Sequence, residues 1–235
     1  MSVGKCLLSI DWDYFICSKV KRYSYIENSK NVLDVWYKRY FVLKRQGKDI
    51  KDLYSLFPEV RDFWEKIRQK FIIKPCVKVY ISDSHVLSYN IARDTRCTSV
   101  YLFDAHADLG YGGLHSLNFE LNCANWLGKL LKDGVIQKAN IVYSPYTLEK
   151  PHDFKEINGM YNVEYITRES IPTGIEVAAV HICRSGAWTP PWYDAKFLKF
   201  VRDSGLSNLE FIDFFPRKWD TRNISLSQQI NYMLA

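Results

Sequence analysis

Short apolar runs alternate along the chain with longer amphipathic stretches, and this alternation predicts the secondary structure. Between about residues 31 and 46, Val32, Trp36, Tyr40 and Leu43 recur at three- and four-residue steps, which is typical of a helix with one buried face. Comparable stretches predict helices at about 58–71, 121–131, 194–202 and 225–234. Apolar runs predict buried strands at 7–10, 77–81, 99–103, 139–143, 162–166, 177–183 and 209–213.

Strands that alternate with helices and are apolar along most of their length are typical of one fold class. They predict an α/β fold with a mostly parallel sheet, flanked by helices on both faces. No internal repeat, low-complexity tract or Gly/Ser linker interrupts residues 1–235, so we expect a single domain. A hydrophobic content of 47% supplies ample material for its core.

Charge and composition limit the classes of function. Lys and Arg outnumber Asp and Glu by 32 to 26, a formal net charge of +6, but the basic residues are scattered, so we expect no nucleic-acid partner. No apolar run approaches the roughly 20 residues that cross a bilayer, and Asp11 and Asp13 interrupt the first one. We therefore expect a cytoplasmic protein with no membrane partner. Its 6 cysteines form no CxxC pair and are expected to be reduced. The sequence is compatible with a homo-oligomer.

Polar residues follow three of the predicted strands directly, at the carboxyl ends where parallel sheets bind ligands. They form three short segments, Ser9–Asp13, Ser82–His85 and Asp104–Asp108. Within them stand six potential metal ligands: Asp11, Asp13, His85, Asp104, His106 and Asp108. Because alternate residues of an extended chain point to the same side, we expect the ligands of each segment to converge.

Four carboxylates gathered at one sheet edge would repel one another unless a cation neutralised them. Carboxylate oxygens combined with imidazoles suit Mn²⁺, Mg²⁺, Fe²⁺ or Zn²⁺, and an oxygen-rich set favours manganese. Such a set can hold two bridged ions that activate water against a carbon or phosphorus centre. Two other interpretations stay open at this point. An Asp-x-Asp strand end also occurs in phosphatases that form an aspartyl-phosphate, and a lone residue such as His85 is often a capping or packing histidine.

The segment Asp104-Ala105-His106-Ala107-Asp108 resembles the DAHxD signature of the arginase and agmatinase (ureohydrolase) family. Ser82-Asp83-Ser84-His85 is similar to the Gly-Gly-Asp-His segment of that family, and Ser9–Asp13 to its Ser-x-Asp-x-Asp segment. The resemblance implies an arginase/deacetylase-like fold and a dimanganese centre held by all six of these ligands. It also implies that Asp108 and Asp11 bridge the two ions, and that Asp108 takes part in catalysis.

The order of the motifs departs from ordinary arginases, because the Asp-x-Asp strand opens the chain instead of following DAHxD. This order resembles that of the divergent peptide arginases, which convert arginine residues of ribosomal precursor peptides to ornithine and release urea. The segment from Arg184 to Pro191 also resembles a segment of that group. The stretch Leu109–Gly113 is Gly-rich and lacks the polar groups that would bind the ends of free arginine, which favours an arginine-containing precursor peptide as the partner.

The resemblance suggests further site residues. Asp213 matches the position of the arginase Glu that binds the guanidinium, but it is one methylene shorter and can instead be an Asp that caps the next turn. His115 is the nearest match to the proton-shuttle His, with a surface histidine as the alternative. The remaining candidates for substrate binding are Asn122, Asn125, Arg184 and Trp188. The two Asn residues can equally cap and pack the following helix.

Three alternatives to a peptide arginase stay open. The first is an arginase- or agmatinase-type hydrolase of a small guanidino compound. The second is another metal-dependent hydrolase on the same scaffold, such as an amide deacetylase or a phosphoesterase. The third is a binding protein that keeps the scaffold without turnover. The complete set of ligands argues against this last alternative.

Overall fold

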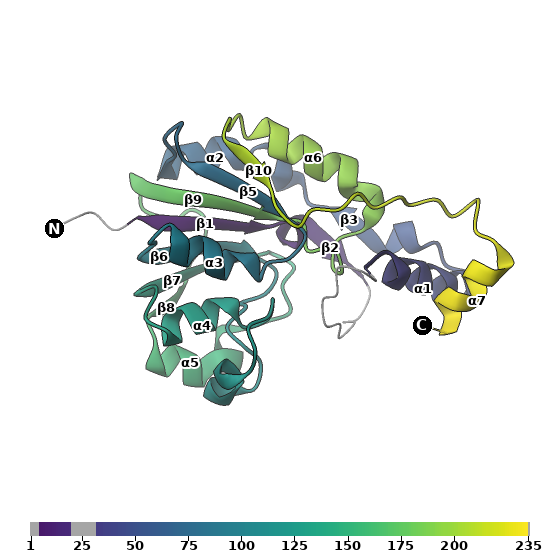
Figure 1. The fold of residues 1–235 in the computed structure, drawn as a ribbon, viewed down its shortest axis with the longest axis horizontal. Coiled ribbons are helices and arrows are strands. Elements are labelled where there is room, and N and C mark those ends of the chain that lie inside the picture. Colours follow the sequence, from purple (N-terminus) through teal and green to yellow (C-terminus); the bar gives the residue numbers. More distant parts are fainter. Residues whose placement is uncertain (1–4, 20–31, 235) are drawn as a thin grey trace.

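The computed structural model describes residues 5–19 and 32–234. Its centre is an eight-stranded sheet whose main path runs β10-β5-β9-β1-β6-β7-β8, with β4 paired to β9, and every pairing in it is parallel. The strands of this sheet are β1 (Cys6–Asp11), β4 (Phe71–Ile72), β5 (Lys78–Ser82), β6 (Ser99–Asp104), β7 (Lys138–Tyr143), β8 (Val163–Tyr165), β9 (Ile175–Cys183) and β10 (Leu209–Phe211). Figure 1 shows β1 in the middle of the sheet.

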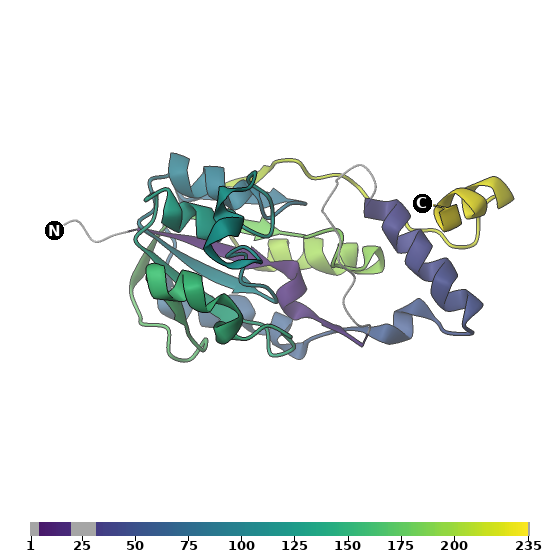
Figure 2. The same cartoon turned by 90° about the horizontal axis from the view of Figure 1, so that it is seen from below.

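Helices cover both faces of the sheet (Figures 1 and 2). The α-helices are α1 (Val32–Arg45), α2 (Phe63–Lys70), α3 (Leu87–Asp94), α4 (Trp126–Lys132), α5 (Lys155–Met160), α6 (Asp194–Asp203) and α7 (Leu226–Leu234). Residues of α2 and α6 pack with Leu8 and Ile10 of β1 in one core cluster, whereas residues of α3, α4 and α5 pack with Leu7 in another. The two clusters follow from the period-2 alternation of side chains along β1.

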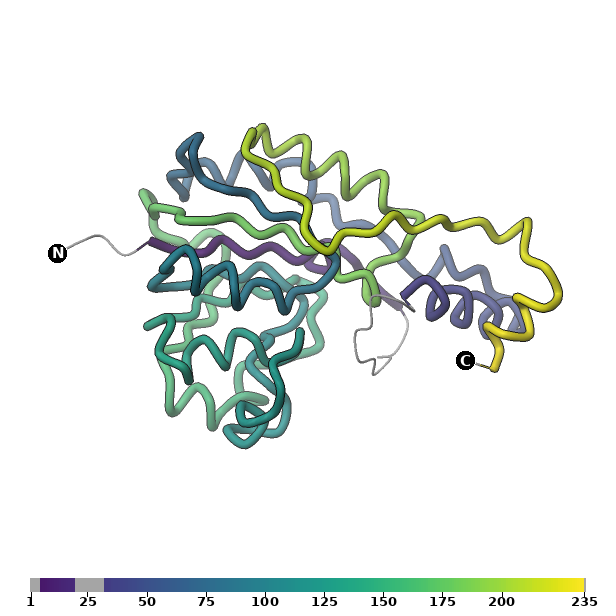
Figure 3. The backbone as a smooth tube through the Cα atoms, viewed as in Figure 1, coloured from purple at the N-terminus to yellow at the C-terminus, as the bar shows by residue number. Residues whose placement is uncertain are grey.

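A smaller part of the molecule lies beyond the carboxyl ends of the strands. Here β2 (Ile16–Ser18) and β3 (Tyr54–Leu56) pair antiparallel, and α1 packs against α7. Tyr37 of α1 holds the C-terminal segment, because its ring stacks on Trp219 and Tyr232, with centroids 4.6 Å apart in both pairs. In Figure 3 the yellow C-terminal segment runs from the sheet to this end of the molecule.

These findings confirm the predicted α/β class with a mostly parallel sheet flanked by helices, and the predicted strands all appear. The helix predicted at 58–71 begins as the 3-10 helix η3 (Pro58–Arg61) before α2, and the one predicted at 121–131 begins only at Trp126. The pairing of β2 with β3, and the helices α3 and α5, were not predicted. These elements are short, so their period carries little signal.

Further 3-10 helices connect these elements. They are η1 (Trp12–Phe15), η2 (Ile50–Leu53), η4 (Gly113–Asn118), η5 (Pro151–Phe154) and η6 (Pro191–Tyr193). No helix in the described part of the chain has both the length and the apolar character that a membrane crossing needs.

Candidate metal centre

The carboxyl ends of three strands bring the predicted ligands together. β1 pairs with β6 in a register that places Ile10 opposite Phe103, so Asp11 and Asp104 end neighbouring strands side by side. β5 lies two strands away on the other side of β1, with β9 between them, and the turn after β5 carries His85 back over this edge. All six predicted ligands line one cavity of about 590 Å³.

The Asp-x-Asp pair converges by a different route from the one expected. Asp11 is the last residue of β1 and also caps η1, because its Oδ1 accepts a hydrogen bond from the backbone N–H of Asp13 at 2.9 Å. Asp13 therefore reaches the cavity from a 3-10 helix and not from an extended strand. The carboxylates of both residues are buried, and the hydroxyl of Ser185, after β9, donates to Asp11.

The Asp104–Asp108 segment also curls instead of remaining extended. His106 donates its backbone N–H to Oδ1 of Asp104 at 2.8 Å, and Asp108 adopts a left-handed backbone with φ of 51°. This conformation costs Asp less than most residues. Trp126 of α4 donates its indole N–H to Oδ2 of Asp108 at 2.6 Å, which fixes the carboxylate toward the other ligands.

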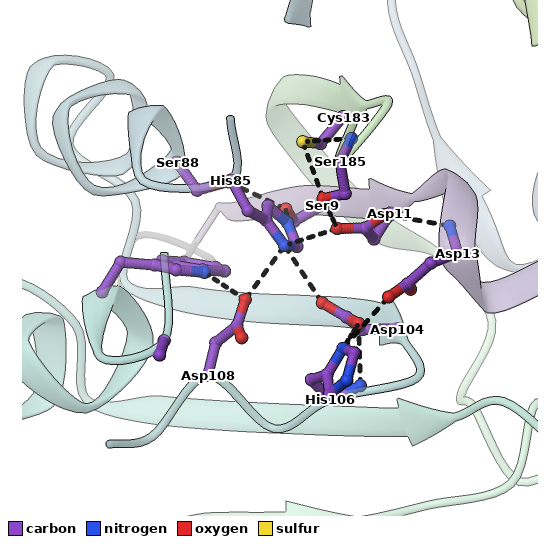
Figure 4. A network of polar contacts seen from close by, with 12 residues as sticks. Ser9, Asp11, Asp13, His85, Ser88, Asp104, His106, Asp108, Cys183 and Ser185 are labelled. Atoms are coloured by element: carbon purple, nitrogen blue, oxygen red, sulfur yellow. Dashed lines mark hydrogen bonds and ion pairs between the residues drawn. The ribbon is translucent and has the colours of Figure 1, made fainter. Parts of the chain in front are cut away.

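A first cluster surrounds Nδ1 of His85 (Figure 4). This nitrogen lies 3.2 Å from Oδ2 of Asp11, 3.0 Å from Oδ2 of Asp104 and 3.0 Å from Oδ2 of Asp108. The other ring nitrogen, Nε2, is 2.7 Å from the hydroxyl of Ser9, so the ring is held from behind. Three carboxylates and one imidazole nitrogen thus face a single point.

A second cluster lies beside the first and includes the more exposed histidine. Nδ1 of His106 is 3.0 Å from Oδ2 of Asp13 and 3.6 Å from Oδ1 of Asp104. Asp104 belongs to both clusters, since its Oδ2 faces His85 and its Oδ1 faces His106. The resemblance implied Asp108 and Asp11 as the bridges, but in this geometry Asp104 is the shared residue, and Asp108 contacts only the His85 side.

The protonation of these side chains reflects their crowding. Burial, together with the negative charges of Asp13 and Asp108, raises the pKa of Asp104 well above its usual range, and burial and Asp13 raise the pKa of Asp11 to about 6. Burial tends to lower the pKa of His85 and His106, but the neighbouring carboxylates outweigh it and raise both pKa values well above 6.5. These raised pKa values mean that, without a bound cation, the side chains hold protons that offset the crowded negative charges.

The donor set fits a divalent cation. Buried polar atoms that face the cavity have no hydrogen-bond partner: Asp13 Oδ2, His85 Nδ1 and Asp104 Oδ2. Buried polar atoms are rarely left so, and cations bound in the two clusters would satisfy them. Asp11, His85, Asp104 and Asp108 can therefore hold a metal ion. Carboxylate oxygens with one imidazole per cluster are ligands that several divalent cations accept.

One acidic residue of the cavity was missed by sequence reasoning. Glu149, in the loop after β7, is only 6% exposed, and its Oε2 accepts the backbone N–H of Ala107 at 2.8 Å. The hydroxyl of Tyr111 donates to its other oxygen, and that of Tyr143 lies 3.4 Å from Oε2. Burial raises the pKa of Glu149, an effect that the charge of His106 opposes. No motif marks this residue; its only signal is its place after the strand next to β6.

The cavity wall outside the ligands is largely aromatic and apolar. Trp188 lines it as expected, with its ring centroid 6.1 Å from that of His106. Further lining side chains come from α1, from β3 and from the loops after β6 and β7: Arg39, Tyr54, Tyr111, Tyr146 and Leu148.

The structure does not bring His115 or the two asparagines to the cavity. His115 is exposed on η4, where its ring contacts Phe119. Oδ1 of Asn125 accepts the backbone N–H of Asn122 at 2.9 Å, and its Nδ2 donates to the carbonyl of Glu120 at 3.0 Å. These contacts brace the loop that leads into α4, and the side chain of Asn125 makes no capping hydrogen bond to the helix. The lining residues of this loop are its neighbours Cys123 and Ala124.

Arg184 and Asp213 also lie outside the lining. Arg184 is buried and forms a bidentate ion pair with Asp83, with Nε–Oδ1 at 2.6 Å and Nη2–Oδ2 at 2.8 Å, and a further bond to Asp194 at 3.0 Å. This network ties the turn after β5 to the loop after β9. Asp213 is exposed after the edge strand β10, and its carbonyl accepts the backbone N–H of Asp83 at 3.2 Å.

A neutral histidine lies directly behind the predicted metal ligands. His181 of β9 is fully buried, and burial together with the positive charge of His85 holds its pKa well below 6.5. Its register neighbour in β1 is Ser9, the residue that contacts His85.

Comparison of the chain with protein-family models, with curated proteins and with solved structures found no match. The resemblance to arginases therefore stays a prediction, which rests on the three motifs described above.

Proposed function

We propose that this chain is a dimanganese-dependent hydrolase that converts arginine residues of a peptide to ornithine residues and releases urea. One observation carries the proposal: Asp104 is shared by two clusters, each completed by a histidine and further carboxylates. Two ions held by one shared carboxylate are typical of sites that activate water for hydrolysis. The reaction adds water to the guanidinium carbon and breaks its bond to the side-chain nitrogen, which leaves as an amine.

The residues of the chain divide the work in this proposal. Asp11, Asp104, Asp108 and His85 would hold one ion, and Asp13, Asp104 and His106 would hold the other. Two ions bound there would supply activation of water and stabilisation of developing charge. Glu149 supplies a negative charge next to His106 that can pair with the planar guanidinium. Five acidic residues thus line the cavity of a protein whose net charge is +6, so attraction for a cationic side chain is local.

The shape of the cavity favours a peptide over a free amino acid. Tyr111, Tyr146 and Leu148 are 51%, 46% and 67% exposed, yet line the cavity. A second depression of about 520 Å³ continues from it and shares Tyr111, Leu148 and Glu149. Tyr111, Leu148 and Phe154 line this second depression together with charged side chains, so the two cavities together offer room for a substrate that extends beyond the reacting side chain.

One lining residue favours a second candidate function. Arg39 of α1 lies in the cavity wall and donates to the carbonyl of Ala187 at 2.7 Å. A cation at this place can bind the carboxylate of a small guanidino acid. The second candidate is therefore an arginase-type hydrolase of a free guanidino acid.

Urea release from a set of substrates tests both candidates. The manganese-loaded protein is incubated with arginine-containing peptides, free arginine and agmatine, and urea is measured. Urea from peptides supports the proposal, whereas urea from free arginine alone supports the second candidate. Agmatine has no carboxylate, so it should react poorly if Arg39 binds that group. No urea from any substrate would refute the hydrolase assignment.

A further inference from the structure

A buried chain of hydrogen bonds leads from His85 into the centre of the sheet. Nε2 of His85 is 2.7 Å from Oγ of Ser9, which is 2.9 Å from Oγ of Ser88 in α3. Oγ of Ser88 is 2.6 Å from Nδ1 of His181, whose Nε2 is 2.8 Å from Oγ of Ser82. Ser9, Ser82, Ser88 and His181 are each 0% exposed, so water does not interrupt the chain. Figure 4 shows its first members behind His85.

The far end of this chain determines the direction of every bond in it. The hydroxyl of Ser82 donates to the carbonyl of Ser84 at 3.0 Å. A serine hydroxyl has one proton, so Ser82 must accept its second bond from an N–H at Nε2 of His181. A neutral imidazole has one N–H, and Nδ1 of His181 is therefore an acceptor that takes the proton of Ser88.

The serine hydroxyls nearer the metal centre also have one proton each. Since Ser88 donates to His181, it accepts from Ser9, and since Ser9 donates to Ser88, it accepts from an N–H at Nε2 of His85. A neutral His85 then has no proton on Nδ1, and the lone pair of this nitrogen faces the three carboxylates at 3.0–3.2 Å. The lone pair and the carboxylates repel one another when no cation lies between them, and all of them attract a cation bound there.

We infer that His181 is a positioning residue which, through Ser88 and Ser9, holds His85 in the tautomer that binds the metal ion. The inference rests on the metal centre of the proposed function. If every bond of the chain ran in the opposite direction, Nδ1 of His85 would carry the proton and donate it to a carboxylate, and the ion would have to displace it. The bond from Ser82 to the Ser84 carbonyl disfavours this reversal. Partners of this kind behind a ligand histidine change metal affinity by roughly 10- to 100-fold.

Manganese titration calorimetry on matched variants tests the inference. Ser88→Ala and His181→Phe both break the chain and are expected to weaken manganese binding by at least about 10-fold. His181→Asn places an oxygen where Nδ1 was, so it can still accept from Ser88 and should recover most of the affinity. Ser204→Ala is the control, since Ser204 is equally buried and donates to a carbonyl at 2.6 Å, but lies at the end of α6. Wild-type affinity in both chain-breaking variants would overturn the inference.

Nitrogen-15 NMR of the metal-free protein provides a readout that does not depend on manganese. His181 should be neutral with its proton on Nε2. Ser88→Ala should change the chemical shift of Nδ1 of His181, because that nitrogen loses the hydroxyl that donates to it. A proton on Nδ1 of His181 in the wild type would overturn the inference. These results are separable from the proposed function. If Ser88→Ala and His181→Phe weaken manganese binding but no urea is released, the hydrolase is refuted and the inference about His181 stands. If urea is released and both variants bind manganese like the wild type, the inference is refuted and the hydrolase stands.

Discussion

Replacing Asp11 with asparagine is expected to stabilise the metal-free protein and to destabilise the protein in manganese. Asp11 is buried among like charges, and its pKa is raised from 3.8 to about 6, by burial first and by Asp13 second. A carboxyl group whose pKa is raised on folding lowers the free energy of unfolding. This penalty is absent below pH 3.8, because the folded and the unfolded protein both hold the proton there. The penalty grows as the pH rises and is complete above about pH 6.

The magnitude follows from the size of this shift. About two pKa units correspond to roughly 3 kcal/mol of unfolding free energy above pH 6. Asparagine removes the charge and keeps an oxygen that can accept the N–H of Asp13. At pH 8 in EDTA, Asp11→Asn should therefore gain up to about 3 kcal/mol, and at pH 4 this gain should fall to about 0.6 kcal/mol. Manganese at 1,000 times its Kd stabilises the wild type by about 4 kcal/mol per ion. The variant should lose this stabilisation where the ion depends on the Asp11 carboxylate.

Urea unfolding at pH 4 and pH 8, in EDTA and in manganese, measures these differences. Asp49→Asn is a matched control, because Asp49 also caps a 3-10 helix and accepts an i+2 N–H at 2.9 Å, but it is exposed. It should behave like the wild type in all four conditions. A lower stability of Asp11→Asn than of the wild type in EDTA at pH 8 would refute this prediction, because the ionised carboxylate would then stabilise the metal-free protein.

Three further predictions concern the same site. Asp104→Asn should lose both manganese ions, whereas Asp13→Asn should lose only the ion on the His106 side; metal analysis after dialysis checks this, and equal losses would refute a shared Asp104. Glu149→Gln should keep its manganese but lower kcat/KM for an arginine peptide by about 10- to 100-fold, because the charged hydrogen bond to the guanidinium becomes a neutral one. His115→Ala is the control, since His115 is remote from the cavity, and it should change kcat/KM by less than about threefold. Manganese affinity should rise from pH 5.5 to 7.5, because the raised pKa values of Asp11 and Asp104 make the metal-free site hold protons that ions displace; a flat calorimetric profile would contradict this.

The convergence of the candidate ligands was predictable from the sequence because their positions depend on a simple rule. In a parallel sheet, residues directly after neighbouring strands meet at one edge, and Asp11 and Asp104 follow apolar runs that could only be buried strands. The rule does not describe the path after the strand. The 3-10 turn that carries Asp13 depends on a local hydrogen bond, and the left-handed Asp108 is held by Trp126, which lies at the start of α4 beyond the intervening loop.

The substrate residues were harder to predict because they depend on which loops fold over the cavity. Arg184 has the chemistry of a substrate-binding group, yet the nearby carboxylates of Asp83 and Asp194 engage it in the protein interior. Asp213 follows a strand as expected, but that strand is the edge strand β10, with β5 and β9 between it and β1. Glu149 enters the cavity from a loop without any motif. Only tertiary structure distinguishes these cases.

The place of β1 explains why a reordered set of motifs can still build one site. β1 comes first in the sequence but lies between β9 and β6, so its neighbours are made of residues far downstream. The order of the motifs along the chain is therefore irrelevant, as long as each one ends a strand at the centre of the sheet. This arrangement also buries four carboxylates where the fold has its core, which no metal-free sheet would favour. In the proposed function, ions would offset this cost, and because their ligands meet only when β1, β5 and β6 are assembled, their binding energy would also be folding energy.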